Sequence, residues 1–174
     1  LPSNPMLKCV NIKKISKIAK KLNIPLIVDD TIGSNLNINS IEHADIVFTS
    51  LTKIFSGSGD ILAGSLILNP KSKWIDQFRN ALNEINLPIL SDGDTVYLEK
   101  VSRDVNQRVF EQNKACLELK KRLETHSEIK NIFHPENCPN FNSLLTSNGG
   151  YGCLLSFELN GGLNKAKKFY DSLK

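Results

Sequence analysis

Side chains that could carry out chemistry follow two apolar segments of the sequence. They comprise two adjacent carboxylates, three hydroxyls and one lysine, with a glycine-containing loop directly after them. In open α/β sheets, ligands bind beyond the carboxyl ends of the strands, so these side chains stand where a ligand would be held. The residues are Asp29, Asp30 and Thr31 after the first segment, Ser50, Thr52 and Lys53 after the second, and 57–60 in the loop.

This set contains the parts of a pyridoxal phosphate site. A lysine beside an apolar sheet edge loses its proton more easily and then acts as an amine nucleophile toward carbonyls. Hydroxyls and loop amides can hold a phosphate, and a buried carboxylate can hold a protonated ring nitrogen. Each residue also has a structural explanation, because Asp29 and Asp30 can cap a turn, Ser50 and Thr52 can satisfy loop amides, and Lys53 can point into water. The spacing alone leaves both interpretations open.

Rival catalytic motifs do not match. Gly57-x-Gly59 lacks the third glycine of a dinucleotide-binding loop, and neither GxxxxGK[ST] nor GxSxG occurs. The four cysteines form no CxxC pair, and His134 with Cys138 supplies only two ligands, so we expect no metal site. Scattered cysteines instead indicate free thiols in a reducing compartment, and we expect a cytoplasmic protein.

The composition is that of a folded protein rather than a disordered or membrane-spanning one. The chain has 174 residues, 40% of them hydrophobic, and a formal net charge of +4, which suits one domain or one and a half. No apolar run approaches the roughly 20 residues that a bilayer requires. Lysines between the isoleucines of 12–22 indicate the solvated face of a helix, and no aromatic residues interleave with them as in a nucleic-acid groove. We therefore expect neither nucleic acid nor a membrane as a partner.

Hydrophobic periodicity predicts an α/β layer followed by a second unit. Continuous apolar runs predict strands that are buried on both faces, as in a parallel sheet covered by helices. The predicted strands are 24–29, 45–51, 63–68 and, partly alternating, 153–159. The predicted helices are 12–22, 73–86 and one of nearly thirty residues that starts near Asp94 or Thr95 and bridges the two units. Pro70, Pro88 and Asp92-Gly93 interrupt these elements.

Ordered motifs make the chain resemble the Cys/Met-metabolism family of pyridoxal-phosphate enzymes. The matching segments are 2–8, 27–31, 44–53 and 57–64, with weaker likeness through Arg103, Arg108 and 149–155. Segments 29–33, 52–57 and 148–152 look like the fungal-type cystathionine γ-synthases. Common members of the family carry Asn, Tyr and His where this chain has Asp30, Ile54 and Ser58. These departures leave the cofactor residues in place and weaken inferences about the substrate.

The resemblance implies an α/β protein of the pyridoxal-phosphate-dependent transferase fold type I, which is aspartate-aminotransferase-like. The chain would hold the second half of the large domain and the start of the smaller C-terminal domain. Residues 1–108 would belong to the large cofactor-binding domain, and residues 109–174 would form the bridging helix and the start of the small domain. Because the chain starts at Leu1 and ends within a helical pattern, we expect a piece of a longer protein that is inactive alone. The family builds its sites across subunit interfaces, which implies a homo-oligomer, usually a tetramer.

The resemblance also assigns roles residue by residue. Lys53 would bind pyridoxal phosphate and shuttle protons, and Asp29 would pair with the ring nitrogen. Ser50 and Thr52 would bind the phosphate, and Asn4 would lie near the ring hydroxyl. The implied reaction is γ-replacement, in which cysteine and an activated homoserine ester give cystathionine. Cystathionine γ-lyase and O-acetylhomoserine sulfhydrylase activities, or an inactive remnant, remain alternatives.

Overall fold

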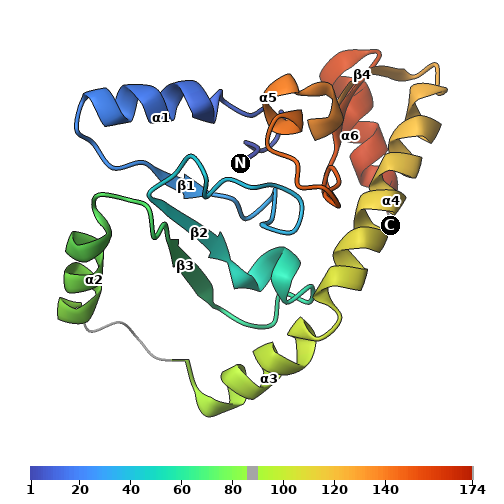
Figure 1. Cartoon of the computed structure of the whole chain (residues 1–174). Helices are drawn as coiled ribbons and strands as arrows, with labels where there is room; N and C mark the ends of the chain where they lie inside the picture. The colour runs from blue at the N-terminus through green and yellow to red at the C-terminus, as the bar shows by residue number, and fades with distance from the viewer. Residues whose placement is uncertain (86–89, 174) are drawn as a thin grey trace.

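A three-stranded mixed sheet lies at the centre of the N-terminal part of the chain (Figure 1). The computed structural model describes residues 1–85 and 90–173. The strands β1 (Ile27–Asp29), β2 (Ile46–Ser50) and β3 (Gly64–Leu68) lie in the order β1-β2-β3. All three predicted strands of this region are therefore present, each with a later start than the apolar run suggested.

The prediction of a parallel sheet is wrong for one of the two strand pairs. β1 and β2 run parallel, whereas β2 and β3 run antiparallel. The connection explains the difference, because the single helical turn Leu51–Phe55 does not carry the chain back along the sheet. β3 starts at the edge where β2 ends, so Ser50 pairs with Gly64. The turn that carries Lys53, which we call the Lys53 turn, stays at the carboxyl edge of β2.

The prediction that the strands are buried on both faces is also wrong for β1 and β3. Side chains alternate between the two faces of a strand, and both faces are covered only at β2, where the neighbours Ile46 and Val47 are both buried. Val28 and Val47 are buried, whereas Ile27 is 53% and Leu66 is 50% exposed. An apolar run therefore located these strands but overstated their burial.

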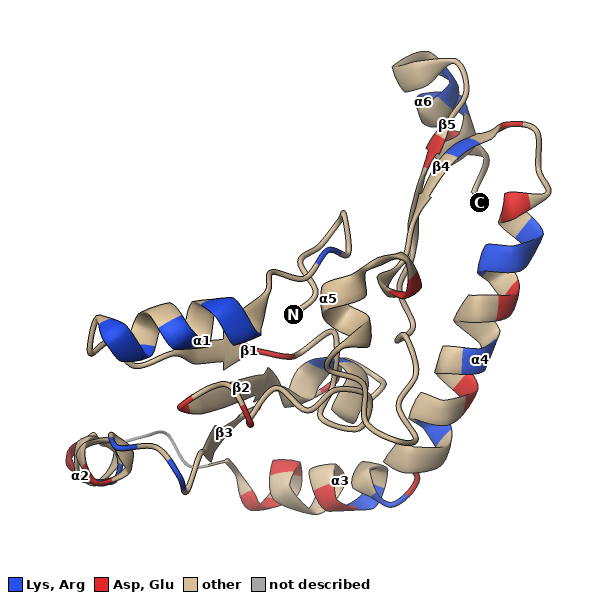
Figure 2. Ribbon diagram, turned by 45° about the horizontal axis from the view of Figure 1, so that its top comes forward, with Lys and Arg blue, Asp and Glu red and all other residues tan. Residues whose placement is uncertain are grey.

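Helix α1 (Ile12–Lys21) confirms the predicted helix, but its apolar stripe is only partly covered, since Ile18 is 56% exposed. The side chain of Asn11 caps its first turn by accepting a hydrogen bond from the Lys14 N–H at 3.0 Å. Ile12 and Ser16 are buried, and the lysines, which recur along the helix (Figure 2), are all exposed. Helix α2 (Ile75–Glu84) occupies most of the predicted 73–86 segment, whose last residue lies outside the described residues, as does Pro88.

The predicted long helix is two helices. α3 (Asp92–Ser102) is capped by the Ser91 side chain rather than by Asp94 or Thr95, and α4 (Val105–Glu124) follows after two residues. The side chain of Arg108 donates a hydrogen bond to the carbonyl of Val101 at 2.9 Å, in the last turn of α3. A side chain on α4 thus binds a carbonyl at the end of α3, and the apolar stripe of the sequence gives no sign of the break.

A two-stranded antiparallel sheet follows α4. It consists of β4 (Ile129–Phe133), which was not predicted, and β5 (Ser156–Leu159), which is the second half of the predicted strand 153–159. α6 (Gly162–Ser172) packs on β5, and α4 runs from beside the Lys53 turn toward this sheet (Figure 1). Within the described ranges, no helix has the length and apolar character needed to cross a membrane.

The main core joins distant parts of the sequence. Phe141, on the short helix α5 (Pro139–Asn142), is fully buried and packs in one cluster with Cys9, Ile12 and Val47. The core therefore draws side chains from both sides of Arg108, where the sequence predicts a domain boundary. That boundary stays a prediction.

Candidate active site

Four of the five predicted site residues line one cavity. Asn4, Asp29, Ser50 and Lys53 all border a space of about 850 Å³ at the carboxyl edges of β1 and β2. The N-terminal segment, two strand ends and the Lys53 turn supply them, so the fold brings together positions up to 49 residues apart, from Asn4 to Lys53. The volume lies within the range of small-molecule sites, which is about 300–1,000 Å³.

The fifth predicted residue, Thr52, does not line this cavity. Its hydroxyl oxygen accepts a hydrogen bond from the N–H of Ala63 at 3.3 Å and so ties the Lys53 turn to the chain before β3. Thr52 therefore has the structural role that the sequence left open, in which its hydroxyl binds a loop amide. Its predicted role in phosphate binding is untested.

Short polar contacts fix the two strand ends relative to each other. The carboxylate of Asp29 accepts a hydrogen bond from the Thr31 N–H at 2.9 Å, and the Thr31 hydroxyl accepts one from the Ser50 N–H at 2.9 Å. These contacts link the end of β1 to the end of β2. The Asp29 side chain borders the cavity and is exposed to it, as a group that binds a ligand must be.

The neighbouring carboxyl group, Asp30, faces the opposite way. It is fully buried and accepts hydrogen bonds from the hydroxyls of Ser40, at 3.2 Å, and Thr49. Burial raises the pKa of Asp30 above its usual value, although the Thr49 and Ser40 hydroxyls act in the other direction. Of the two adjacent acids, Asp29 is available to a ligand and Asp30 belongs to the interior.

Part of the cavity wall comes from residues that the sequence did not single out. These are Gln112 on α4 and, before β5, Cys153 and Leu154. Burial raises the pKa of the Cys153 thiol. The likeness of 149–155 to the family was the only signal in the sequence, and it gave no role to these side chains.

Two asparagines hold that wall against α4. The Asn113 amide donates to Asn37 Oδ1 at 2.7 Å and accepts a hydrogen bond from the Gly152 N–H at 2.8 Å. The Gly150 N–H donates to the same Asn37 oxygen at 3.0 Å. A Cβ at Gly150 would overlap the Asn113 side chain, so this close approach requires glycine.

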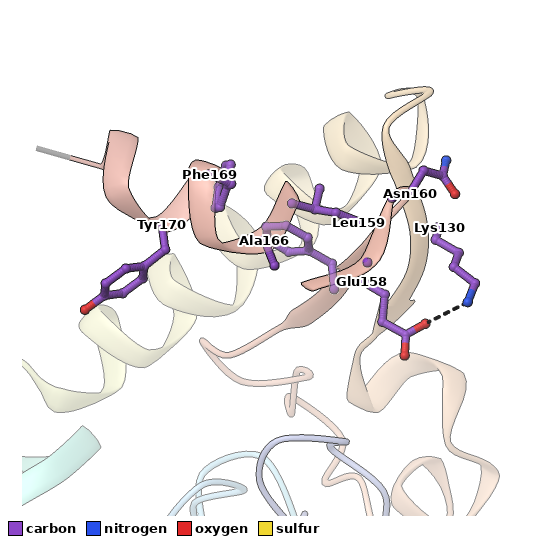
Figure 3. A pocket seen from close by; sticks show the side chains of 10 residues that line it. Lys130, Glu158, Leu159, Asn160, Ala166, Phe169 and Tyr170 are labelled. Carbon is purple, nitrogen blue, oxygen red and sulfur yellow. Dashed lines mark ion pairs between the residues drawn. The ribbon is translucent and has the colours of Figure 1, made fainter. Parts of the chain in front are cut away.

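A second large cavity lies far along the chain from these residues. It has a volume of about 790 Å³ and opens between β5 and α6, with Phe169 and Tyr170 on one side and Lys130 and Glu158 on the other (Figure 3). Lys130 and Glu158 form an exposed ion pair at 3.9 Å. None of the predicted site residues borders this cavity.

The chemistry around the first cavity defines the class of protein. A primary amine, a carboxylate, a hydroxyl and a side-chain amide surround a space whose remaining wall is partly apolar, through Phe48 and Ile54 among others. These groups fit pyridoxal phosphate, since the amine suits its aldehyde, the carboxylate its ring nitrogen and the hydroxyl its phosphate. The chain has the fold and the donor set of a pyridoxal-phosphate-dependent enzyme.

Comparison with known proteins gives the family. A model of the Cys/Met metabolism PLP-dependent enzymes matches residues 1–174, and the chain belongs to that family. It is 32% identical over 176 residues to a cystathionine γ-synthase of Neurospora crassa, with 99% of this chain and 28% of that protein covered. It is 33% identical over 190 residues to the cystathionine γ-synthase of Saccharomyces cerevisiae, with 99% and 29% covered.

Solved structures support the same fold. The chain superposes with a TM-score of 0.81 and 24% identity on a cystathionine γ-synthase of Xanthomonas oryzae pv. oryzae in complex with aminoacrylate and cysteine. For a cystathionine γ-lyase of Lactobacillus plantarum in complex with L-serine, the values are 0.80 and 23%. In both cases 99% of this chain and 45% of the other is covered. The predicted α/β fold and fungal-type likeness are confirmed, and the chain spans under a third of the length of the two fungal relatives.

Proposed function

We propose that the complete protein uses pyridoxal phosphate for γ-replacement and joins cysteine to an activated homoserine ester to give cystathionine. The observation that carries this proposal is the convergence of Lys53, Asp29, Ser50 and Asn4 on one cavity. We place γ-replacement first because the fungal relatives at 32% and 33% identity are cystathionine γ-synthases.

In this proposal each residue of the cavity has a chemical task. Bound pyridoxal phosphate supplies an electron sink for charge that develops on the substrate carbon. Lys53 would hold the aldehyde carbon of the cofactor through its amine, and it would move protons from Cα and Cβ of the substrate. The Asp29 carboxylate would keep the proton on the ring nitrogen. The Ser50 hydroxyl would donate to the phosphate, and the Asn4 amide would serve the ring hydroxyl.

The proposal extends to the assembly of the protein. Segments outside this chain would supply further phosphate contacts and the group that binds the substrate carboxylate. Residues 1–108 would belong to the large domain and residues 109–174 to the bridging helix and the small domain. The functional form would be a cytoplasmic homo-oligomer, a tetramer by analogy with the family.

Reductive trapping tests the cofactor site. Full-length protein is incubated with pyridoxal phosphate and reduced with borohydride, and the modified peptide is mapped by mass spectrometry. We expect the label on Lys53, and its loss in Lys53→Ala. Lys71→Ala, at an exposed lysine away from the cavity, serves as the matched control. A folded protein that takes up no label on Lys53 would favour the inactive remnant.

Product analysis tests the reaction. Full-length enzyme is given an acylated homoserine with either cysteine or sulfide, and separately cystathionine alone. We expect cystathionine from the first mixture. Homocysteine formed from the sulfide mixture alone would assign a sulfhydrylase, and net cleavage of cystathionine without synthesis would assign a γ-lyase.

A further inference from the structure

The Lys53 turn cannot satisfy all of its own carbonyl groups. The Leu51 carbonyl accepts a hydrogen bond from the Ser56 N–H at 2.9 Å, and the Lys53 carbonyl accepts one from the Gly57 N–H at 2.9 Å. The Ser56 hydroxyl donates to the Thr52 carbonyl at 2.8 Å. Two carbonyls remain at the end of the turn, on Ile54 and Phe55. Carbonyls at a helical C-terminus need an outside donor.

One arginine on α4 is that donor. Nη1 of Arg108 donates to the Ile54 carbonyl at 2.7 Å, and Nη2 donates to the Phe55 carbonyl at 3.0 Å. Nη2 also contacts the carbonyl of Val101 at 2.9 Å and the carboxylate of Asp104 at 3.2 Å. A positive charge at the C-terminal end of a helical turn is favourable as well. All five carbonyls of Leu51–Phe55 are therefore engaged, the last two by Arg108.

The loop after the turn leaves room for this contact. Gly57 has φ of +78°, and a Cβ there would lie 2.6 Å from Nη1 of Arg108. The guanidinium thus packs against the backbone of the Gly57 loop as well as against the Lys53 turn. Gly57 borders the cavity and Arg108 does not, so the arginine contacts the backbone next to the cavity without lining it.

A second arginine on the same stretch offers a contrast. Arg103 makes a two-fold contact with the Glu99 carboxylate, at 3.0 and 2.9 Å, and its side chain is 72% exposed. The side chain of Arg108 is 22% exposed. Both side chains pair with an acid four residues earlier, but only Arg108 reaches across to another element.

We propose that Arg108 is a positioning residue, which holds the backbone of the Lys53 turn and so fixes the direction of the Lys53 amine at the cavity. The effect of Arg108 on cofactor chemistry rests on the proposed function of Lys53. The contacts of Arg108 with the backbone of the Lys53 turn do not depend on that function. Lysine cannot replace the arginine, because an ammonium is a single charged point and lacks the planar fork that reaches two adjacent carbonyls at once.

The first test measures hydrogen exchange in full-length protein without cofactor. The amides of Ser56 and Gly57 close the turn, and their exchange reports its opening. We expect exchange in peptides over 51–57 to rise about tenfold in Arg108→Gln and Arg108→Lys, as for the loss of hydrogen bonds to a charged donor. Arg103→Gln should match the wild type. Peptides of β4 and β5 should exchange at the wild-type rate in all variants.

The second test measures the bound cofactor. The visible circular dichroism of pyridoxal phosphate reports a fixed orientation at Lys53, and borohydride trapping reports the rate of its capture. We expect both Arg108 variants to lose most of the dichroic signal and to trap about tenfold more slowly at limiting cofactor, while Arg103→Gln keeps both. A loss of general stability alone would move the urea midpoint without this local pattern.

The outcomes separate this inference from the proposed function. Wild-type exchange over 51–57 in both Arg108 variants, or an increase shared equally by β4 and β5, would overturn the positioning role. A wild-type protein that never labels Lys53 would overturn the proposed function, while the exchange result would still decide the backbone role of Arg108.

Discussion

Replacement of Asp30 by asparagine should make the protein more stable at neutral pH. Asp30 is fully buried, and its carboxyl oxygens accept hydrogen bonds from the hydroxyls of Ser40 and Thr49. An asparagine has nearly the same shape. Its amide can accept from one hydroxyl and donate to the other, because a hydroxyl both donates and accepts. The substitution therefore removes a buried charge and keeps two hydrogen bonds.

The size of the effect follows from two opposing contributions. Burial of an ionised carboxylate costs several kcal/mol, and each hydrogen bond to the charge returns about 1.5–3 kcal/mol. Because burial is the largest influence on the pKa of Asp30 and raises it above 3.8, the cost exceeds the return. We expect the unfolding free energy at pH 7 to rise by about 0.5–2 kcal/mol, the range that single stabilising substitutions commonly give.

The stability gained by Asp30→Asn depends on pH in a direction that the raised pKa of Asp30 sets. Between pH 3.8 and the higher folded pKa, the folded state binds the proton of Asp30 more tightly than the unfolded state, so ionisation lowers stability as pH rises. The advantage of Asp30→Asn should be full at pH 7 and should shrink toward zero near pH 4. Urea unfolding of full-length protein between pH 7.5 and 4.5 measures it.

A matched control separates burial from charge removal. Asp76→Asn removes a carboxylate that is 83% exposed, and its stability should change by no more than about 0.5 kcal/mol. Trapping of pyridoxal phosphate on Lys53 should continue in Asp30→Asn, because Asp30 does not border the cavity. A destabilised Asp30→Asn at pH 7, or a gain that is the same at all pH values, would refute the reasoning.

Two further expectations concern the core and the thiols. Phe141→Ala should lower the unfolding free energy by about 3–5 kcal/mol in urea, since the ring is fully buried in the main core; a loss below about 1 kcal/mol would contradict that packing. Burial raises the pKa of Cys9 to about 12 and that of Cys116 to about 11, so at pH 8 iodoacetamide should modify the partly exposed Cys153 faster than either. Bound pyridoxal phosphate should slow the reaction at Cys153, and equal rates in mass spectrometry would contradict its place on the cavity wall.

The sequence predicted the parts of the site that follow strands. Apolar runs located β1 and β2, and the rule that ligands bind beyond strand ends then singled out Asp29, Ser50 and Lys53. The structure brings these residues to one cavity. Asn4 came only from the family resemblance, since nothing in local pattern relates a residue before α1 to a strand end.

What the sequence missed depends on contacts between distant residues. The break between α3 and α4 involves a side chain of α4 that binds a carbonyl of α3, and helical periodicity does not report such a contact. The antiparallel β3 follows from the path of the connection rather than from the composition of the strand. Gln112 and Cys153 have no local signal, because their place on the cavity wall depends on how α4 and the segment before β5 approach the sheet.

The spacing between two side chains of α4 limits how this part of the sequence can change in length. Arg108 reaches the Lys53 turn, and Asn113 reaches Gly152, next to Cys153 on the cavity wall. One residue inserted between them would turn the second about 100° around the helix axis and move it about 1.5 Å along it. The helix could then keep the contact of Arg108 or that of Asn113, but not both. We therefore expect relatives that share this site to differ in residue identity at outward positions such as Glu111, but to accept insertions and deletions only outside the stretch from Arg108 to Asn113.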